Sequence, residues 1–145
     1  MTKVFVICMA FMYMVLPGVS AAGSLTDNGN GTVTDSGTLL TWQQGGNGPM
    51  TWAAALTYCE GLILAGGQYD WRLPNIKELG SLADDSRVNP AIDPLFTSTI
   101  SSGYWSSTTV ASSTSNAWNV NFSYGYSPFS YKTSSNYVRC VRGGQ

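Results

Sequence analysis

Residues 116–143 read NAWNVNFSYGYSPFSYKTSSNYVRCVRG, and this stretch decides the fold class. At its start, Trp118, Val120 and Phe122 alternate with polar residues, which is typical of a strand with one apolar and one polar face. At its end, NYVRCVRG predicts a further strand, and the upstream segment GYWSSTT predicts another. We therefore expect the chain to end in an antiparallel sheet.

A first helix is predicted for residues 51–65. Trp52, Leu56, Cys59 and Ile63 recur at helical spacing, a threonine precedes them as N-cap, and two glycines end the segment. This spacing places Cys59 on the buried face of the helix.

A second helix is predicted in DWRLPNIKELGSLADD, residues 70–85. Asn75 and Glu78 have the spacing of a capping box, and the proline before them favours an extended entry. Arg72 is expected to form an ion pair with a nearby acid, with a ligand contact as the alternative. The apolar stripe of this helix, expected in the core, comprises Ile76, Leu79 and Leu82.

The segment TDNGNGTVTDSGTLLTW, residues 26–42, predicts a hairpin because its two Asn-Gly pairs suit tight turns. The expected strands are residues 32–34 and 39–42. The order of hairpin, two helices and late sheet indicates an α+β fold, with two helices packed on small antiparallel sheets. The oxygen-bearing side chains of the hairpin offer calcium as an alternative to turn formation, and they are Asp27, Asn28, Asn30 and Asp35.

Residues 1–22 have the pattern of a secretory signal peptide: an early lysine, an apolar run, a Pro-Gly break and small residues for cleavage. Residues 23–145 then form one domain, with no membrane span left after cleavage. The expected location is outside the cell, at its surface or in the periplasm.

Two cysteines remain in that domain, Cys59 and Cys140. In an exported protein they predict a disulfide, which closes a loop of roughly 80 residues and is worth about 4 kcal/mol in the chain-entropy model. Two buried thiols are the alternative.

Charge and composition exclude several classes of function. The net charge is −1, and after Asp93 the only charged residues are Lys132, Arg139 and Arg142, which argues against nucleic-acid binding. The chain has no histidine, which removes Ser-His and Cys-His catalysis and disfavours a transition-metal site. We expect no enzyme activity and no cofactor. The five tryptophans are expected mostly in the core.

Four motifs in order carry a family resemblance: TDNGNGTVTDSGTLLTWQ, DWRLPNIKEL, YWSSTT and NYVRCVRGG. They resemble the Lcl C-terminal domain family of bacterial collagen-like adhesins, whose members look like relatives of the C-type lectin fold. The resemblance implies a compact α+β domain whose early and last strands lie close together. Oxidative enzymes of related fold need reactive cysteines or a histidine iron site, so the resemblance implies no enzyme here.

C-type-lectin-like folds also serve as variable proteins of diversity-generating retroelements, in which errors at template adenines rewrite the end of the gene. Between Val110 and Tyr131, only Trp118 lies outside the residues that mutated Asn codons encode. We therefore predict a C-terminal variable binding face, rich in the tyrosine and serine typical of binding loops. The predicted ligand-binding residues are Ser112, Ser113, Ser115, Ser123, Tyr124, Tyr126, Phe129, Ser130, Tyr131, Ser134 and Ser135.

The expected partner is a protein or glycan on a cell or phage surface. Two alternatives stay open. The first is a fixed adhesin for glycans or glycosaminoglycans, for which only three cations lie nearby. The second is a structural envelope module without a ligand.

Overall fold

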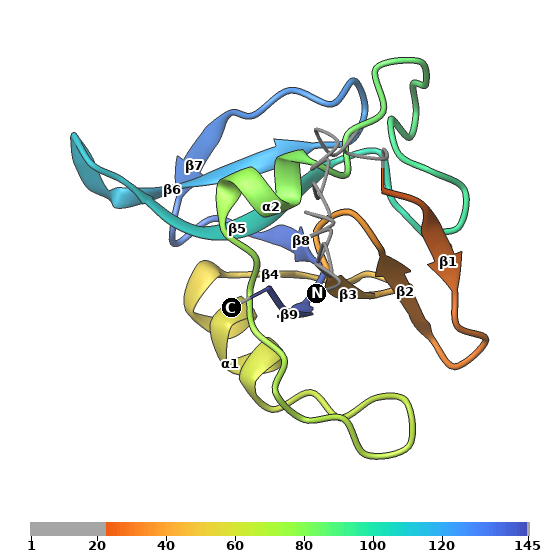
Figure 1. Ribbon diagram of the computed structural model, residues 1–145. Helices are drawn as coiled ribbons and strands as arrows, with labels where there is room; N and C mark the ends of the chain where they lie inside the picture. The colour runs from red at the N-terminus through yellow and green to blue at the C-terminus, as the bar shows by residue number, and fades with distance from the viewer. Residues whose placement is uncertain (1–22, 145) are drawn as a thin grey trace, which may run out of the picture.

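The structure is a computed structural model that describes residues 23–144, so the predicted signal peptide lies outside the described residues. The chain folds as an α+β domain with two short helices and two sheets (Figure 1). Its elements are β1 Leu25–Asp27, β2 Thr32–Asp35, β3 Leu40–Gln43, β4 Asn47–Met50, α1 Trp52–Glu60, α2 Ile76–Gly80, β5 Gly103–Val110, β6 Ser113–Asn121, β7 Phe129–Tyr131, β8 Asn136–Val138 and β9 Val141–Gly143.

The strands form a four-stranded sheet in the order β1-β2-β3-β9 and a five-stranded sheet in the order β4-β8-β5-β6-β7. All pairs are antiparallel except β5 with β8. The antiparallel β3–β9 pair joins the start of the chain to its end, as the family resemblance implies. β7 is an edge strand, because β6 is its only strand neighbour among residues 23–144.

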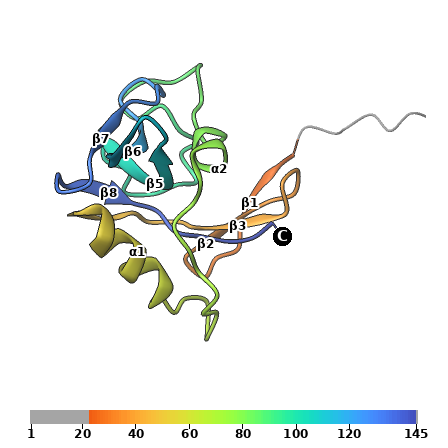
Figure 2. The same cartoon turned by 90° about the vertical axis from the view of Figure 1, so that its left-hand side faces the viewer.

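The two faces of the five-stranded sheet are covered by different cores. On one face, Tyr104, Val120 and Phe122 pack with α2 and the small sheet. On the other face, Trp105 and Ala117 pack with α1 and the disulfide. The two helices therefore lie on different sides of the sheet (Figure 2). The predicted alternation of apolar and polar residues is present from Trp118 to Ser123, but the strand is not half-buried as predicted, because its polar face is covered and Asn119 is only 2% exposed.

The helix caps agree with the sequence. The Thr51 side chain accepts from the Ala54 N–H at the start of α1. Asn75 and Glu78 form the predicted capping box at the start of α2. The first helix is shorter than predicted, because it ends at Glu60 and Gly61 caps it. Ile63 is consequently 67% exposed instead of buried.

The segment NYVRCVRG is not one strand but two, and this corrects the prediction. β8 belongs to the large sheet and β9 to the small one. Between them Arg139 and Cys140 are fully buried, and the Cys140 carbonyl accepts from the Gln43 N–H at 2.9 Å. The chain crosses from one sheet to the other here, so this single segment contributes residues to both cores.

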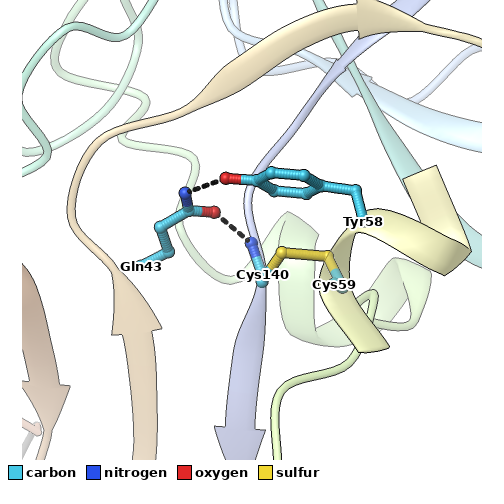
Figure 3. The surroundings of a disulfide bond; sticks show 4 residues. All are labelled: Gln43, Tyr58, Cys59 and Cys140. Atoms are coloured by element: carbon cyan, nitrogen blue, oxygen red, sulfur yellow. Dashed lines mark hydrogen bonds between the residues drawn. A yellow bond between two sulfur atoms is a disulfide. The ribbon is translucent and has the colours of Figure 1, made fainter. Parts of the chain in front are cut away.

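The disulfide is confirmed. Cys59 of α1 is bonded to Cys140, with 5.5 Å between their Cα atoms. Gln43 accepts from the Cys140 N–H through Oε1 and donates through Nε2 to the Tyr58 hydroxyl (Figure 3). This network joins α1, β3 and the crossing between β8 and β9.

The tryptophans lie mostly in the core, as predicted. Trp42, Trp71 and Trp105 are at most 3% exposed. Trp52 and Trp118 are half-buried.

Candidate binding surface

The stretch after β6 is more ordered than its sequence indicates, because it continues as a hairpin. Trp118 lies opposite Phe129, and Asn116 lies opposite Tyr131. The same register continues to the bridge between Asn121 and Tyr126. A segment without aliphatic side chains is therefore held by backbone pairing to β6.

Four large rings stand out from this hairpin. Tyr124 and Tyr131 are each 65% exposed, Phe129 is 56% exposed and Tyr126 is 53% exposed. We call these four residues the aromatic rim. A cluster of exposed rings is unusual, because such apolar groups are normally buried or used for binding.

The register distributes the rim over both faces of the sheet. Directly opposed residues of an antiparallel pair share a face, so Phe129 lies on the face of Trp118. Their rings are in edge-on contact at 5.6 Å between centroids. Tyr126 is paired with Asn121 and lies on the opposite face. The half-buried Trp118 thus supports the rim. The sequence did not indicate this role, because Trp118 fits the apolar alternation of a core strand.

The turn that carries Tyr124 is held by the scaffold. The Asn89 N–H donates to the Ser123 carbonyl at 2.9 Å, and the Ser123 hydroxyl donates to the Ser101 carbonyl at 2.9 Å. Gly125 has a φ of +79°, and a Cβ there would lie 3.2 Å from the Ala83 Cβ. The backbone is fixed while the Tyr124 ring projects into solvent.

The predicted serines lie at both ends of the hairpin. Ser112, Ser113 and Ser115 are in or beside the β5–β6 turn, at the end of β6 away from Tyr124. The nine residues of β6 separate these ends by roughly 25 to 30 Å at strand spacing. The Ser115 carbonyl accepts from the Lys132 N–H at 2.9 Å, which brings the β7–β8 turn to the same end. The predicted positions therefore form a strip along the outer edge of the sheet, not a single pocket.

None of the eleven predicted positions is buried. Ser113, Ser123 and Ser130 are half-buried, and the other eight are exposed. Ser130 is partly occupied as a scaffold contact, because its hydroxyl accepts from Asn119 Nδ2 at 3.0 Å.

The nearby cations are engaged elsewhere. Lys132 Nζ donates to the Thr109 hydroxyl at 2.8 Å and lies 4.0 Å from the centre of the Trp52 ring. Arg142 is paired with Asp70 at 2.6 Å. Arg139 is fully buried, so it cannot contact an external polyanion.

Arg139 has an unusual environment for a charged side chain. Its guanidinium lies 4.7 Å from the Phe96 ring centre and donates one hydrogen bond, from Nη2 to the Thr99 hydroxyl at 2.9 Å. Among the described residues, its Nε and Nη1 atoms have no hydrogen-bond partner. Burial lowers the pKa of Arg139 to about 10.

Arg72 forms the ion pair that the sequence predicts. Its Nη1 and Nη2 atoms donate to the two Glu78 carboxylate oxygens, each at 2.8 Å. Hydrogen bonding to Arg72 holds the pKa of the Glu78 carboxyl below its ordinary value. Since Glu78 also accepts from the Asn75 N–H, the pair fixes the entry to α2.

The four oxygen-bearing residues of the hairpin serve its turns. Asp27 accepts from the Gly29 N–H and Asn30 accepts from the Thr32 hydroxyl, both within the β1–β2 turn. Asp35 accepts from the Gly37 N–H at the far end of β2. Among residues 23–144, no group of three or more His, Cys, Asp or Glu side chains is arranged to hold a metal ion.

Two hollows of the surface have linings that contain no residue of the aromatic rim. A hollow of about 380 Å³ is lined by residues between Arg87 and Phe96, and one of about 470 Å³ lies beside Asp70 and Arg72. The rim itself borders a protruding sheet edge. Within the part of the chain that the structure describes, no helix is long and apolar enough to span a bilayer.

Comparison with known proteins gives one family. The sequence model of the family described as the Lcl C-terminal domain matches residues 31–142. A search of curated proteins finds no match to the chain. The matched range includes both sheets except β1 and the last residue of β9, both helices and the whole aromatic rim.

Proposed function

The chain belongs to the Lcl C-terminal domain family, and from this premise we propose that it is an exported, non-catalytic binding domain. The family points to an extracellular domain, and the disulfide is compatible with that location. In this proposal the aromatic rim binds a protein or glycan on the surface of a cell or phage.

The observation that carries the proposal is the exposure of four rings on a fixed backbone. A fully buried ring of this kind covers 150–250 Å². At 53–65% exposure, the four rings present about 400–600 Å² in sum. The rings lie on both faces of the sheet, so this sum is not one contiguous patch, but large exposed apolar side chains gathered on one hairpin are often functional. Binding costs little ordering entropy, because the hairpin is already paired and tyrosine has few rotatable bonds.

We also propose that the fold is C-type lectin-like. Support comes from the α+β architecture and from the β3–β9 pair, which brings an early strand to the end of the chain. The disulfide from α1 to the β8–β9 crossing closes the same arrangement.

Diversification by a retroelement remains part of the proposal for the strip. Substitution is tolerated best at exposed positions, and all eleven candidates are exposed or half-buried. The neighbouring scaffold residues Val120, Phe122 and Val138 are 0% exposed and need to stay fixed. The genome should then carry, near this gene, a reverse transcriptase and a non-coding near-copy of the segment encoding residues 104–145. If the mismatches between this copy and the gene fall evenly on all four template bases, the diversification proposal is refuted and a fixed adhesin is left.

A glycosaminoglycan adhesin is disfavoured by the three late cations. Arg139 is buried, while Lys132 and Arg142 have partners within the domain. A neutral glycan stays compatible with the rim, since aromatic rings pack against apolar sugar faces.

The binding experiment compares three forms of the fluorescently labelled domain on a glycan array and on whole bacterial cells and phage particles. The rim variant changes Tyr124, Tyr126, Phe129 and Tyr131 to serine. The matched control is Tyr69→Ser, because Tyr69 is 76% exposed but lies in the loop after α1. We expect wild type and control to bind the same targets, and the rim variant to bind at least tenfold more weakly with an unchanged melting temperature. No binding by any form favours the structural envelope module, and equal binding by all three forms would place the ligand site outside the aromatic rim.

A further inference from the structure

The outer edge of β7 presents unpaired main-chain groups. The Pro128 carbonyl accepts from the Asn119 N–H, and the Lys132 N–H donates to the Ser115 carbonyl, so both residues point toward β6. Along a strand, the N–H and C=O groups of successive residues alternate between its two sides. Ser127, Phe129 and Tyr131 therefore point away from β6.

Nearly all of the main-chain groups on this outer side lack a hydrogen-bond partner among the described residues. The Tyr131 carbonyl accepts from the Ser134 N–H at 2.8 Å. Among the described residues, β7 pairs with no second strand, which leaves two N–H and two C=O groups of Ser127 and Phe129 and the N–H of Tyr131. From Ser127 to Tyr131 these groups span roughly 13 Å at strand spacing.

Apart from the shortness of β7, which has three residues, the usual protections of an edge strand are missing here. Proteins protect such edges with charged side chains, bulges or prolines. Pro128 points toward β6, so its missing N–H affects the inner ladder and leaves the outer row intact. The adjacent Lys132 is bonded to Thr109, and the residues of β7 are uncharged. An unprotected edge flanked by exposed rings has the properties of a strand-binding site.

We propose that this edge binds an extended, uncharged polypeptide segment of the ligand as an added strand. The inference rests on the proposed function and specifies its partner class. Main-chain groups of the ligand would pair with Ser127, Phe129 and Tyr131. Side chains on one face of the added strand would contact Phe129 and Tyr131, and those on the other face would contact Tyr126. The row of neutral main-chain groups and neutral side chains complements an uncharged segment.

A second copy of this chain fits the edge less well than a peptide. A stable dimer buries about 800 Å² on each partner. An edge roughly 13 Å long with strands roughly 5 Å apart supplies only a small part of that area. A single strand needs no such area, because it can contact rings on both faces of the sheet at once.

The test isolates the main-chain groups from the side chains. Ser127→Pro removes one outward N–H, and Ser127→Ala is its matched control because it keeps that N–H. Phe129→Pro against Phe129→Ala makes the same comparison at the centre of the edge. Proline is tolerated in an edge strand where its nitrogen faces solvent, so both proline variants should fold. Circular dichroism and melting temperature verify this.

The probe is a phage-displayed library of linear seven-residue peptides, panned on the wild-type domain. Selected peptides are synthesised, and their dissociation constants are measured by fluorescence anisotropy. We expect each proline variant to bind about three- to tenfold more weakly than its alanine control, the effect of one lost hydrogen bond. Bound peptide should slow hydrogen exchange of the Phe129 and Tyr131 amides at least tenfold, while the Ser130 amide is already slow in the free domain.

Three results would overturn the proposal: no peptide selected above background, equal affinities within each proline and alanine pair, or unchanged exchange at Phe129 and Tyr131. A concentration-dependent dimer with a slow Phe129 amide in free protein would assign the edge to a second copy instead. If the serine rim variant loses cell binding while the proline pairs do not differ, the proposed function stands and the edge proposal fails.

Discussion

Removing the disulfide should destabilise the domain more than any single change on its surface. The perturbation is the double substitution of Cys59 and Cys140 by alanine. Both residues are 0% exposed, and the bond spans 81 residues of sequence. Since the crosslink restricts the unfolded chain, its loss raises the entropy of that state.

The expected magnitude follows from the loop length. For the 81-residue separation, the chain-entropy relation gives about 4.5 kcal/mol at 25 °C. Loss of two buried sulfur atoms adds on the order of 1 kcal/mol. A domain of about 120 residues has an unfolding entropy of about 0.25 kcal/mol per kelvin, so the melting temperature should fall by about 20 °C. This is a large share of a typical total stability of about 5–15 kcal/mol.

The assay is urea unfolding followed by tryptophan fluorescence and circular dichroism. The unfolding free energy of each variant must be extrapolated with that variant's own m, the slope of free energy against urea concentration. An unfolded chain without the crosslink exposes more surface, so its m is larger. Reduced wild-type protein is the matched control, since it keeps both sulfur atoms and lacks only the bond. A difference below about 1.5 kcal/mol between oxidised and reduced wild type would refute the loop argument. Two alkylatable thiols in the folded exported protein would refute the pairing itself.

Four further substitutions test the packing and the charges. Trp105→Ala should cost about 3–5 kcal/mol because the ring is fully buried, whereas Tyr131→Ala should stay within about 0.5 kcal/mol; thermal unfolding of both decides whether the rim belongs to the core. Glu78→Gln should cost about 1–2 kcal/mol at pH 7 after solvent screening. Because the pKa of Glu78 is lowered by Arg72, this difference should be complete above pH 4.5 and shrink as pH falls through the folded value; a constant difference down to pH 2 would contradict the ion pair. Arg139→Met should raise the unfolding free energy by about 1–3 kcal/mol at pH 7, since it removes a buried charge with two unpartnered nitrogens. Burial lowers the pKa of Arg139 to about 10, so the folded state releases this proton before the unfolded state does, and wild type alone should gain stability from this group as the pH rises above about 10. A destabilised methionine variant would contradict the cost of burying the charge.

Local chemistry explains why several features were predictable from the sequence. The capping box of Asn75 and Glu78 uses side chains only three residues apart, so the pattern contains the whole interaction. The turn at Gly29 and Gly31 needs positive φ angles of +69° and +83°, which glycine provides. The disulfide was predictable because residues 23–145 contain only two cysteines.

The length of the first helix was harder to predict, because apolar spacing continues past its end. Leu62 and Ile63 extend the helical pattern, yet Gly61 caps α1 and the chain leaves the helix. Ile63 then lies in solvent, while its neighbours Leu62 and Leu64 pack against the core beside the disulfide. The periodicity of the sequence shows which residues are apolar. The position of the sheet decides how many turns of the helix can pack against it.

The sequence predicted which segment carries the candidate surface, but not how its side chains are arranged in space. Ring and hydroxyl composition identified residues 123–131. The composition did not indicate β7, because three residues without aliphatic side chains carry no strand pattern of their own. Pairing with β6 makes this strand, and the pairing also sorts Phe129 and Tyr126 onto different faces.

The sequence alone therefore determined the α+β class, both helix starts, the cysteine pair and the segment that holds the rim, because each depends on residue identity over short distances or on simple counting. Tertiary structure alone decided that NYVRCVRG divides between two sheets, that Arg139 is buried without a carboxylate, and that β7 has an open edge. These features depend on which distant segments meet. Which segments meet is determined by the burial of whole sheet and helix faces. The residues of one strand do not show which neighbouring segment will cover them.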